Sequence, residues 1–82
     1  MDELKDTVAL MLDESYKNRF RAEYWQLRIR AEKLTKMVLK YEEGTLDFEP
    51  TCSLGLLQNQ LTAMDRYLAL LQARATIEKI EL

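Results

Sequence analysis

Residues 20–41 read FRAEYWQLRIRAEKLTKMVLKY, and their pattern is the strongest structural signal in the chain. Its apolar residues follow one another at alternating spacings of four and three, which is typical of a long helix that packs against a partner helix. This first seam comprises Phe20, Tyr24, Leu27, Ala31, Leu34, Val38 and Tyr41. We predict a long helix over about residues 15–42, and Gly44 can take the left-handed conformation that ends it.

A second seam with the same regular spacing follows closer to the C-terminus. It comprises Leu54, Leu57, Leu61, Met64, Leu68, Leu71 and Ala75. The spacing predicts a helix over about residues 54–78. Residues 44–53 between the two helices contain Pro50, which is incompatible with a helix interior, so they form a loop. A loop of this length makes the two long helices an antiparallel hairpin.

The hairpin loop carries further local signals. Thr51 or Ser53 can cap the helix that follows, because each hydroxyl can accept a hydrogen bond from a free backbone N–H. Leu46 and Phe48 alternate with polar residues, and we expect an extended loop that buries both side chains against the helices.

The N-terminal residues form a short third pattern. Leu4, Val8, Met11 and Leu12 lie at helical spacing and predict a short helix over about residues 3–12. We expect a break near residues 13–15, where Asp13 or Ser15 could cap the next helix, although one continuous helix is the alternative. The chain is thus predicted to be a single all-α domain, residues 1–82, built as a helical hairpin with a short N-terminal helix.

The sequence has more apolar residues than so short a chain can bury. Of its 82 residues 48% are apolar. A folded chain of this size leaves about 40% of its unfolded surface exposed to water, so much of this apolar surface cannot be buried within one chain. An outer stripe lies beside the second seam and comprises Leu56, Ala63, Tyr67, Leu70 and Ile77. Trp25, Ile29 and Met37 widen the first seam in the same way. One partner helix cannot cover both the seam and the neighbouring stripe of the same helix. We therefore predict an interlocked homo-oligomer in which other protomers cover the flanking residues.

Composition argues against the commonest enzyme and membrane classes. There is no histidine and only one cysteine, which excludes His-dependent nucleophile pairs, His-ligated zinc and an intramolecular disulfide. We expect no catalytic residue, no metal and no cofactor. The acidic N-terminus is unlike a signal peptide, and no apolar run approaches the roughly 20 residues of a membrane span. We therefore expect an intracellular protein without membrane contact.

Basic residues are concentrated in one segment. Residues 17–40 hold eight basic and two acidic residues, a charge of +6 in a chain whose net charge is −2. The segment is either a solvated helix face or a local anion site. The acidic flanks would repel a long phosphate backbone, so long nucleic acid is disfavoured. A small phosphorylated ligand fits the dimensions of the basic segment better. The aromatic residues of this segment have two interpretations. They are buried in the core and the oligomer interface, or they stack on the bases of a nucleotide ligand.

The run YKNRFRAEY over residues 16–24 and a pattern in the last helix carry a resemblance. That pattern is Gln-x-x-x-Met-x-x-Tyr-x-x-x-Leu-x-x-Arg, formed by Gln60, Met64, Tyr67, Leu71 and Arg74. Over about residues 15–82 the chain resembles a family of small helical phage proteins related to a crAss-like phage protein, which includes the phage anti-CBASS sponges. The resemblance implies a hairpin fold assembled as an interlocked hexamer that sequesters cyclic oligonucleotides.

The resemblance also implies ligand-binding residues. Lys33 and Tyr16 would serve cyclic dinucleotides, while Thr35 and Arg74 would serve cyclic trinucleotides, in pockets between protomers. Lys33 and Thr35 are two residues apart on a helix and point in different directions, so they cannot readily hold one ligand within one chain.

The leading hypothesis is a phage counter-defence protein that binds cyclic di- or trinucleotide immune messengers, without turnover, in the cytoplasm of the infected bacterial host. One alternative is a sponge for another nucleotide-derived signal. The other is a helical oligomeric interaction protein that docks a phage or host protein, for which the basic segment would be incidental.

Overall fold

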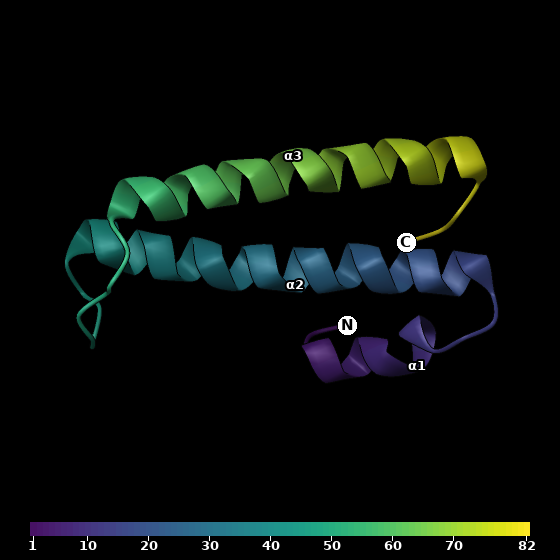
Figure 1. Cartoon of the computed structure of the whole chain (residues 1–82), viewed down its shortest axis with the longest axis horizontal. Helices are drawn as coiled ribbons and strands as arrows, with labels where there is room; N and C mark the ends of the chain where they lie inside the picture. Colours follow the sequence, from purple (N-terminus) through teal and green to yellow (C-terminus); the bar gives the residue numbers. More distant parts are fainter.

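The computed structural model describes all 82 residues, and its regular secondary structure is entirely helical. A 3₁₀ helix η1 (Leu4–Thr7) leads into a short α1 (Val8–Met11), and two long helices follow, α2 (Tyr16–Glu43) and α3 (Leu54–Glu78). Figure 1 shows α2 and α3 antiparallel and side by side, with the N-terminal segment along another side of α2. The predicted all-α hairpin with a short N-terminal helix is confirmed.

Side-chain and backbone caps fix both ends of α2. Ser15 is the N-cap, and its Oγ accepts a hydrogen bond from the Asn18 N–H at 3.4 Å. Asp13 instead accepts from the Ser15 N–H at 2.7 Å and shapes the break before the helix, so the continuous-helix alternative is wrong. Gly44 ends α2 at a φ of 72°, a conformation that costs glycine little because it has no Cβ.

Helix α3 is capped at both ends. Ser53 is the N-cap, and its Oγ accepts a hydrogen bond from the Leu56 N–H at 3.2 Å. At the other end Lys79 takes a left-handed conformation with φ 58°, and the Ile80 N–H donates to the Ala75 carbonyl at 2.8 Å. This turn reverses the chain, so the last residues run back toward α2 (Figure 1).

The core lies at the open end of the hairpin, where α2 begins and α3 ends. Its five buried residues are Phe20, Tyr24, Leu71, Ala75 and Ile80. The last of these comes from the C-terminal tail, which was not predicted to contribute. The tail is held by polar contacts with α2, including a hydrogen bond of 2.6 Å from Arg21 Nε to the Glu81 carbonyl.

The N-terminal segment covers a second face of α2. Thr7 is fully buried, and its Oγ accepts a hydrogen bond from Gln26 Nε2 at 2.9 Å while donating to the Leu4 carbonyl at 2.7 Å. Ile29 lies three residues after Gln26 on the same face and is only 3% exposed. The expectation that other protomers must cover Ile29 is therefore wrong, because the chain's own first residues cover this face.

The outer stripe of α3 is uncovered within one chain, as expected. Leu56, Leu70 and Ile77 are 58%, 57% and 80% exposed, and Ala63 and Tyr67 are exposed as well. The expected burial of the loop side chains holds only in part. Leu46 is half-buried, but Phe48 is 53% exposed, so its predicted burial is wrong.

Candidate functional site

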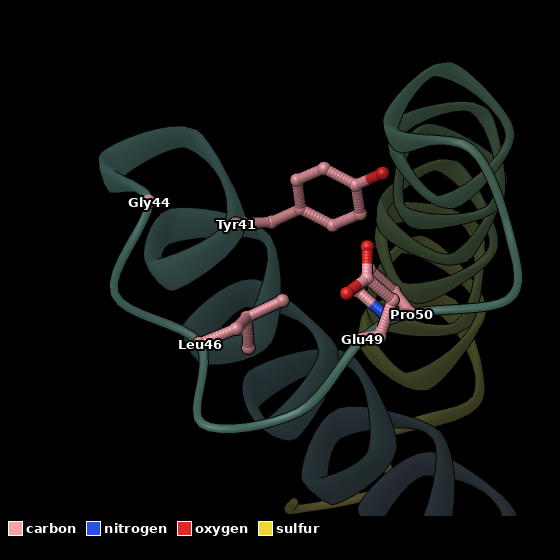
Figure 2. A pocket seen from close by; sticks show the side chains of 5 residues that line it. All are labelled: Tyr41, Gly44, Leu46, Glu49 and Pro50. Atoms are coloured by element: carbon pink, nitrogen blue, oxygen red, sulfur yellow. The ribbon is translucent and has the colours of Figure 1, made fainter.

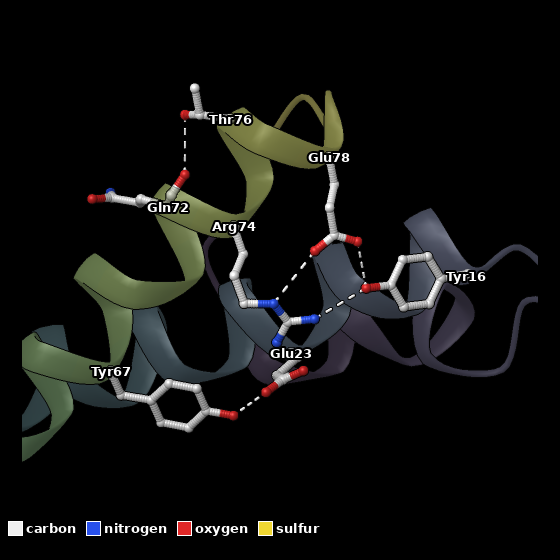
Figure 3. Close-up of polar contacts among 7 residues, drawn as sticks. All are labelled: Tyr16, Glu23, Tyr67, Gln72, Arg74, Thr76 and Glu78. Carbon is white, nitrogen blue, oxygen red and sulfur yellow. Dashed lines mark hydrogen bonds and ion pairs between the residues drawn. The ribbon is translucent and has the colours of Figure 1, made fainter.

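Two of the four residues predicted to bind ligand meet at the open end of the hairpin. Tyr16 is the first residue of α2, and Arg74 lies near the end of α3. Arg74 Nη2 donates a hydrogen bond to the Tyr16 phenol oxygen at 3.1 Å. The phenol in turn donates to Glu78 Oε1 at 2.7 Å, and Arg74 Nε lies 3.4 Å from Glu78 Oε2 (Figure 3).

This triad has a defined electrostatic character. The hydrogen bond to the Glu78 carboxylate raises the pKa of the Tyr16 phenol, because it stabilises the protonated form. The Arg74 guanidinium also lies over the Phe20 ring, 5.0 Å from its centroid, which is a favourable cation–π distance. The Arg74 guanidinium is therefore held in a fixed orientation, and its Nε–H is already paired with the Glu78 carboxylate.

Tyr67 makes a similar contact beside this triad. Its phenol donates a hydrogen bond to the Glu23 carboxylate of α2, which raises the pKa of Tyr67 (Figure 3). Both phenols thus have carboxylate partners within the chain.

The other two predicted residues lie elsewhere on α2. Lys33 is 17 residues beyond Tyr16, which corresponds to about 26 Å along a helix. Thr35 is exposed, but its hydroxyl donates to the Ala31 carbonyl at 2.8 Å. One chain therefore brings Tyr16 together with Arg74, and it joins neither Lys33 with Tyr16 nor Thr35 with Arg74.

Lys33 lies between two adjoining hollows on α2. The first, here called the central groove, has a volume of about 350 Å³ and lies where Leu4, α2 and α3 meet, with Arg30 and Lys33 on its wall. The second, here called the loop groove, has a volume of about 270 Å³ and lies between α2 and the hairpin loop. Its lining comprises Lys33, Lys36, Met37, Lys40, Leu46, Asp47 and Phe48.

The charges of these two grooves are nearly all positive. Arg30, Lys33, Lys36 and Lys40 are exposed, and none of the four is in an ion pair. They lie within eleven residues of α2, and the first and last are about 15 Å apart along the helix. Asp47 is the one acidic residue that lines either groove. Unpaired cations beside a concave surface concentrate positive potential and favour an anionic ligand.

A third hollow, at the tip of the hairpin, has a different character. It has a volume of about 230 Å³ and is lined by Tyr41, Gly44, Leu46, Glu49 and Pro50 (Figure 2). It has no cation, and the Glu49 carboxylate points into the same region as the Tyr41 ring. A phosphate would be repelled there, so the anion-binding character is confined to the other two grooves.

Sequence reasoning missed several residues of these sites. Glu78 could have been found, because it lies four residues after Arg74, the spacing of an ion pair on a helix. Lys36 and Lys40 were noted only as part of the basic segment. Phe48 could not have been placed on a groove from its spacing, because its exposure depends on the path of the loop.

No group of three or more His, Cys, Asp and Glu side chains is arranged to hold a metal ion. None of the helices combines the length and the apolar character that crossing a membrane requires.

A protein-family model described as Sequestin matches residues 14–77. This stretch includes α2, the hairpin loop and all but the last residue of α3, with all four predicted ligand-binding residues. Comparisons with curated proteins and with solved structures give no match.

Proposed function

The chain belongs to the Sequestin family, and we propose that it sequesters a nucleotide-derived immune messenger and does not convert it. The name of the family describes sequestration. The observation that carries the proposal is the row of four unpaired cations along α2, which lines two adjoining grooves inside the matched stretch. Phosphates of a small ligand are the partners that such cations favour.

The ligands in this proposal are cyclic di- and trinucleotides. Lys33 and Tyr16 would bind the former and Thr35 and Arg74 the latter. Within one chain Lys33 lies far along α2 from Tyr16, and Thr35 lies far from Arg74, which contacts Tyr16 from α3. Each pocket therefore needs residues from two protomers. The alternative ligand is another nucleotide-derived immune signal, which would use the same cations.

The exposed outer stripe supports an assembly of several copies. Leu56, Ala63, Leu70 and Ile77 recur at intervals of seven residues, which is the repeat of a helix that packs against a second helix. We propose an interlocked homo-oligomer, a hexamer in its full form. The stripe also favours the second candidate function, in which the oligomer docks a phage or host protein.

Binding without turnover is consistent with the titratable side chains of the chain. General acid–base catalysis works best with a group whose pKa lies near the working pH. The chain has no histidine, and the perturbed phenols of Tyr16 and Tyr67 are shifted away from neutrality. The proposed setting is the cytoplasm of a phage-infected bacterium, where the protein would act as a counter-defence factor that removes the messenger from its effector.

A thermal-shift panel tests the proposal. The protein is heated with cyclic di- and trinucleotides and with an ADP-ribose derivative. A ligand at 100 times its dissociation constant stabilises the folded state by about 2.7 kcal/mol. The bound ligand is then released by denaturation and identified by chromatography, and we expect it to be recovered unchanged. Absence of any shift across the panel would refute the proposal, and recovery of a converted product would refute binding without turnover.

A further inference from the structure

Phe48 is an exposed aromatic side chain in a loop whose two ends are fixed. At one end the Thr45 N–H donates to the Lys40 carbonyl at 2.9 Å, directly after the Gly44 cap. At the other end Ser53 caps α3. Phe48 is nevertheless 53% exposed and lies on the wall of the loop groove. The side chain is thus displayed at a groove and takes no part in the core.

The opposite wall of the loop groove is one face of α2. Lys33, Lys36 and Lys40 lie at spacings of three and four, so their side chains lie next to one another on this face. Met37 of the same face and Leu46 of the loop add apolar surface to the lining of this groove. Three lysines and an aromatic ring therefore line the same hollow, together with apolar surface.

The two halves of this groove suit different parts of one ligand. An inorganic anion would use the lysines and leave Phe48 unused, while an uncharged aromatic molecule would use Phe48 and leave the lysines unused. A phosphorylated nucleoside uses both, because its base can stack on an aromatic face while its phosphate contacts lysines. Lysines act as mobile point charges and do not impose the bidentate geometry of arginine, so the phosphate can vary in position.

We propose that the loop groove is a nucleotide subsite complete within one chain, in which Phe48 stacks on the base and Lys36 and Lys40 hold the phosphate. The subsite rests on the proposed function, and it assigns ligand contacts to three residues outside the set of Tyr16, Lys33, Thr35 and Arg74. Lys33 also lines the central groove, so the phosphate of a second linked nucleotide can follow the cations from one groove into the next.

The chain offers a direct spectroscopic test because it has only two phenylalanines. Phe20 is 3% exposed and lies under the Arg74 guanidinium, so it reports on the open end of the hairpin. Phe48 reports on the loop groove. The protein is labelled with 4-fluorophenylalanine, and the two fluorine resonances are followed during titration with cyclic di-adenylate, adenosine monophosphate, adenosine and inorganic phosphate. We expect both nucleotides to shift the Phe48 resonance, with smaller shifts from adenosine or phosphate at equal concentration.

Calorimetry of three variants completes the test. We expect Phe48→Ala to weaken nucleotide binding by at least about fivefold, as loss of a stacking contact does. Phe48→Leu keeps apolar surface without the aromatic face and should weaken binding similarly. Lys36→Gln with Lys40→Gln should weaken binding and reduce its dependence on salt. The matched control, Lys5→Gln with Lys79→Gln, removes two charges outside the grooves and should bind as the unaltered protein does.

The outcomes separate the two proposals. If nucleotides bind but leave the Phe48 resonance and the affinities of these variants unchanged, the subsite is refuted and the proposed function stands. If phosphate alone shifts Phe48 as strongly as adenosine monophosphate, the stacking role is refuted. If calorimetry detects no binding of any member of the wider ligand panel, the proposed function itself fails.

Discussion

Arg74 and Tyr16 are 58 residues apart in the sequence, yet Arg74 Nη2 donates a hydrogen bond to the Tyr16 phenol oxygen at 3.1 Å. The contact joins the first residue of α2 to the last part of α3, and Glu78 binds both partners. In a single chain Arg74 is therefore already engaged by a carboxylate. A phosphate that uses this guanidinium must compete with Glu78.

The first prediction follows from this competition. If Arg74 binds cyclic trinucleotides, Glu78→Gln should raise their affinity by about two- to fivefold, the scale of an exposed ion pair. Calorimetry with cyclic tri-adenylate measures the change. Glu81→Gln removes an acid from the C-terminal tail and serves as the control. Equal affinity in the Glu78 variant and the unaltered protein would show that Arg74 does not contact the phosphates.

The second prediction concerns alkaline pH. The carboxylates of Glu78 and Glu23 raise the pKa values of Tyr16 and Tyr67 above the ordinary value of 10.0. A raised pKa means that the folded state favours the protonated phenol. These contacts therefore stabilise the fold fully below pH 10, and their contribution is lost as the pH rises through the folded-state pKa values.

Absorbance at 295 nm measures the ionisation of the phenols. We expect Glu78→Gln and Glu23→Gln each to move one tyrosine to a lower pKa. Tyr16→Phe and Tyr67→Phe identify which phenol is affected. Unchanged titration curves in both carboxylate variants would contradict the assigned hydrogen bonds.

The third prediction concerns the C-terminal tail. Ile80 is 6% exposed and packs in the core cluster with Phe20 and Leu71. Ile80→Ala should lower the free energy of unfolding by about 2–3 kcal/mol, because it removes buried methyl groups and leaves a cavity. Urea denaturation at fixed protein concentration measures the change. The control is Leu82→Ala, at a residue that is 40% exposed, which should change the urea midpoint much less. Equal urea midpoints in the two variants would contradict the packing of the tail.

The fourth prediction concerns assembly. Leu70→Glu with Ile77→Glu places two charges on the outer stripe and should dissociate the oligomer, because charges at the centre of an apolar interface are costly to desolvate. Light scattering should then give the 9.7 kDa mass of one chain, with helical circular dichroism retained. Thr62→Glu with Thr76→Glu adds the same charge on another face of α3 and should leave the assembly intact. An unaltered protein that is already a monomer at micromolar concentration would refute the assembly.

Much of the fold could be predicted because its signals are local. The two seams, the break before Tyr16, Gly44 and Pro50 each act through the geometry of a few neighbouring residues. They place the long helices and the loop without knowledge of any distant contact. The choice of Ser15 over Asp13 and of Ser53 over Thr51 as caps could not be made, because both members of each pair have a suitable side chain.

The candidate sites could be predicted less completely. The basic segment was evident from the charge pattern, and Tyr16, Lys33, Thr35 and Arg74 were named from a resemblance. Their pairing in space was not evident, because it depends on how the two helices are aligned. Phe48 was placed in the core from an alternation of apolar and polar residues, a rule for strands that does not hold for this loop.

The amino-acid sequence alone is enough to predict a helical hairpin with a basic α2 and an uncovered apolar stripe on α3. Periodicity and capping act within a few residues, so these features need no tertiary information. Four features depend on the three-dimensional arrangement: the N-terminal segment covers Ile29, Ile80 completes the core, Arg74 meets Tyr16, and Phe48 lines a groove with three lysines. Each of these depends on where the chain reverses its direction and on which residues then become neighbours.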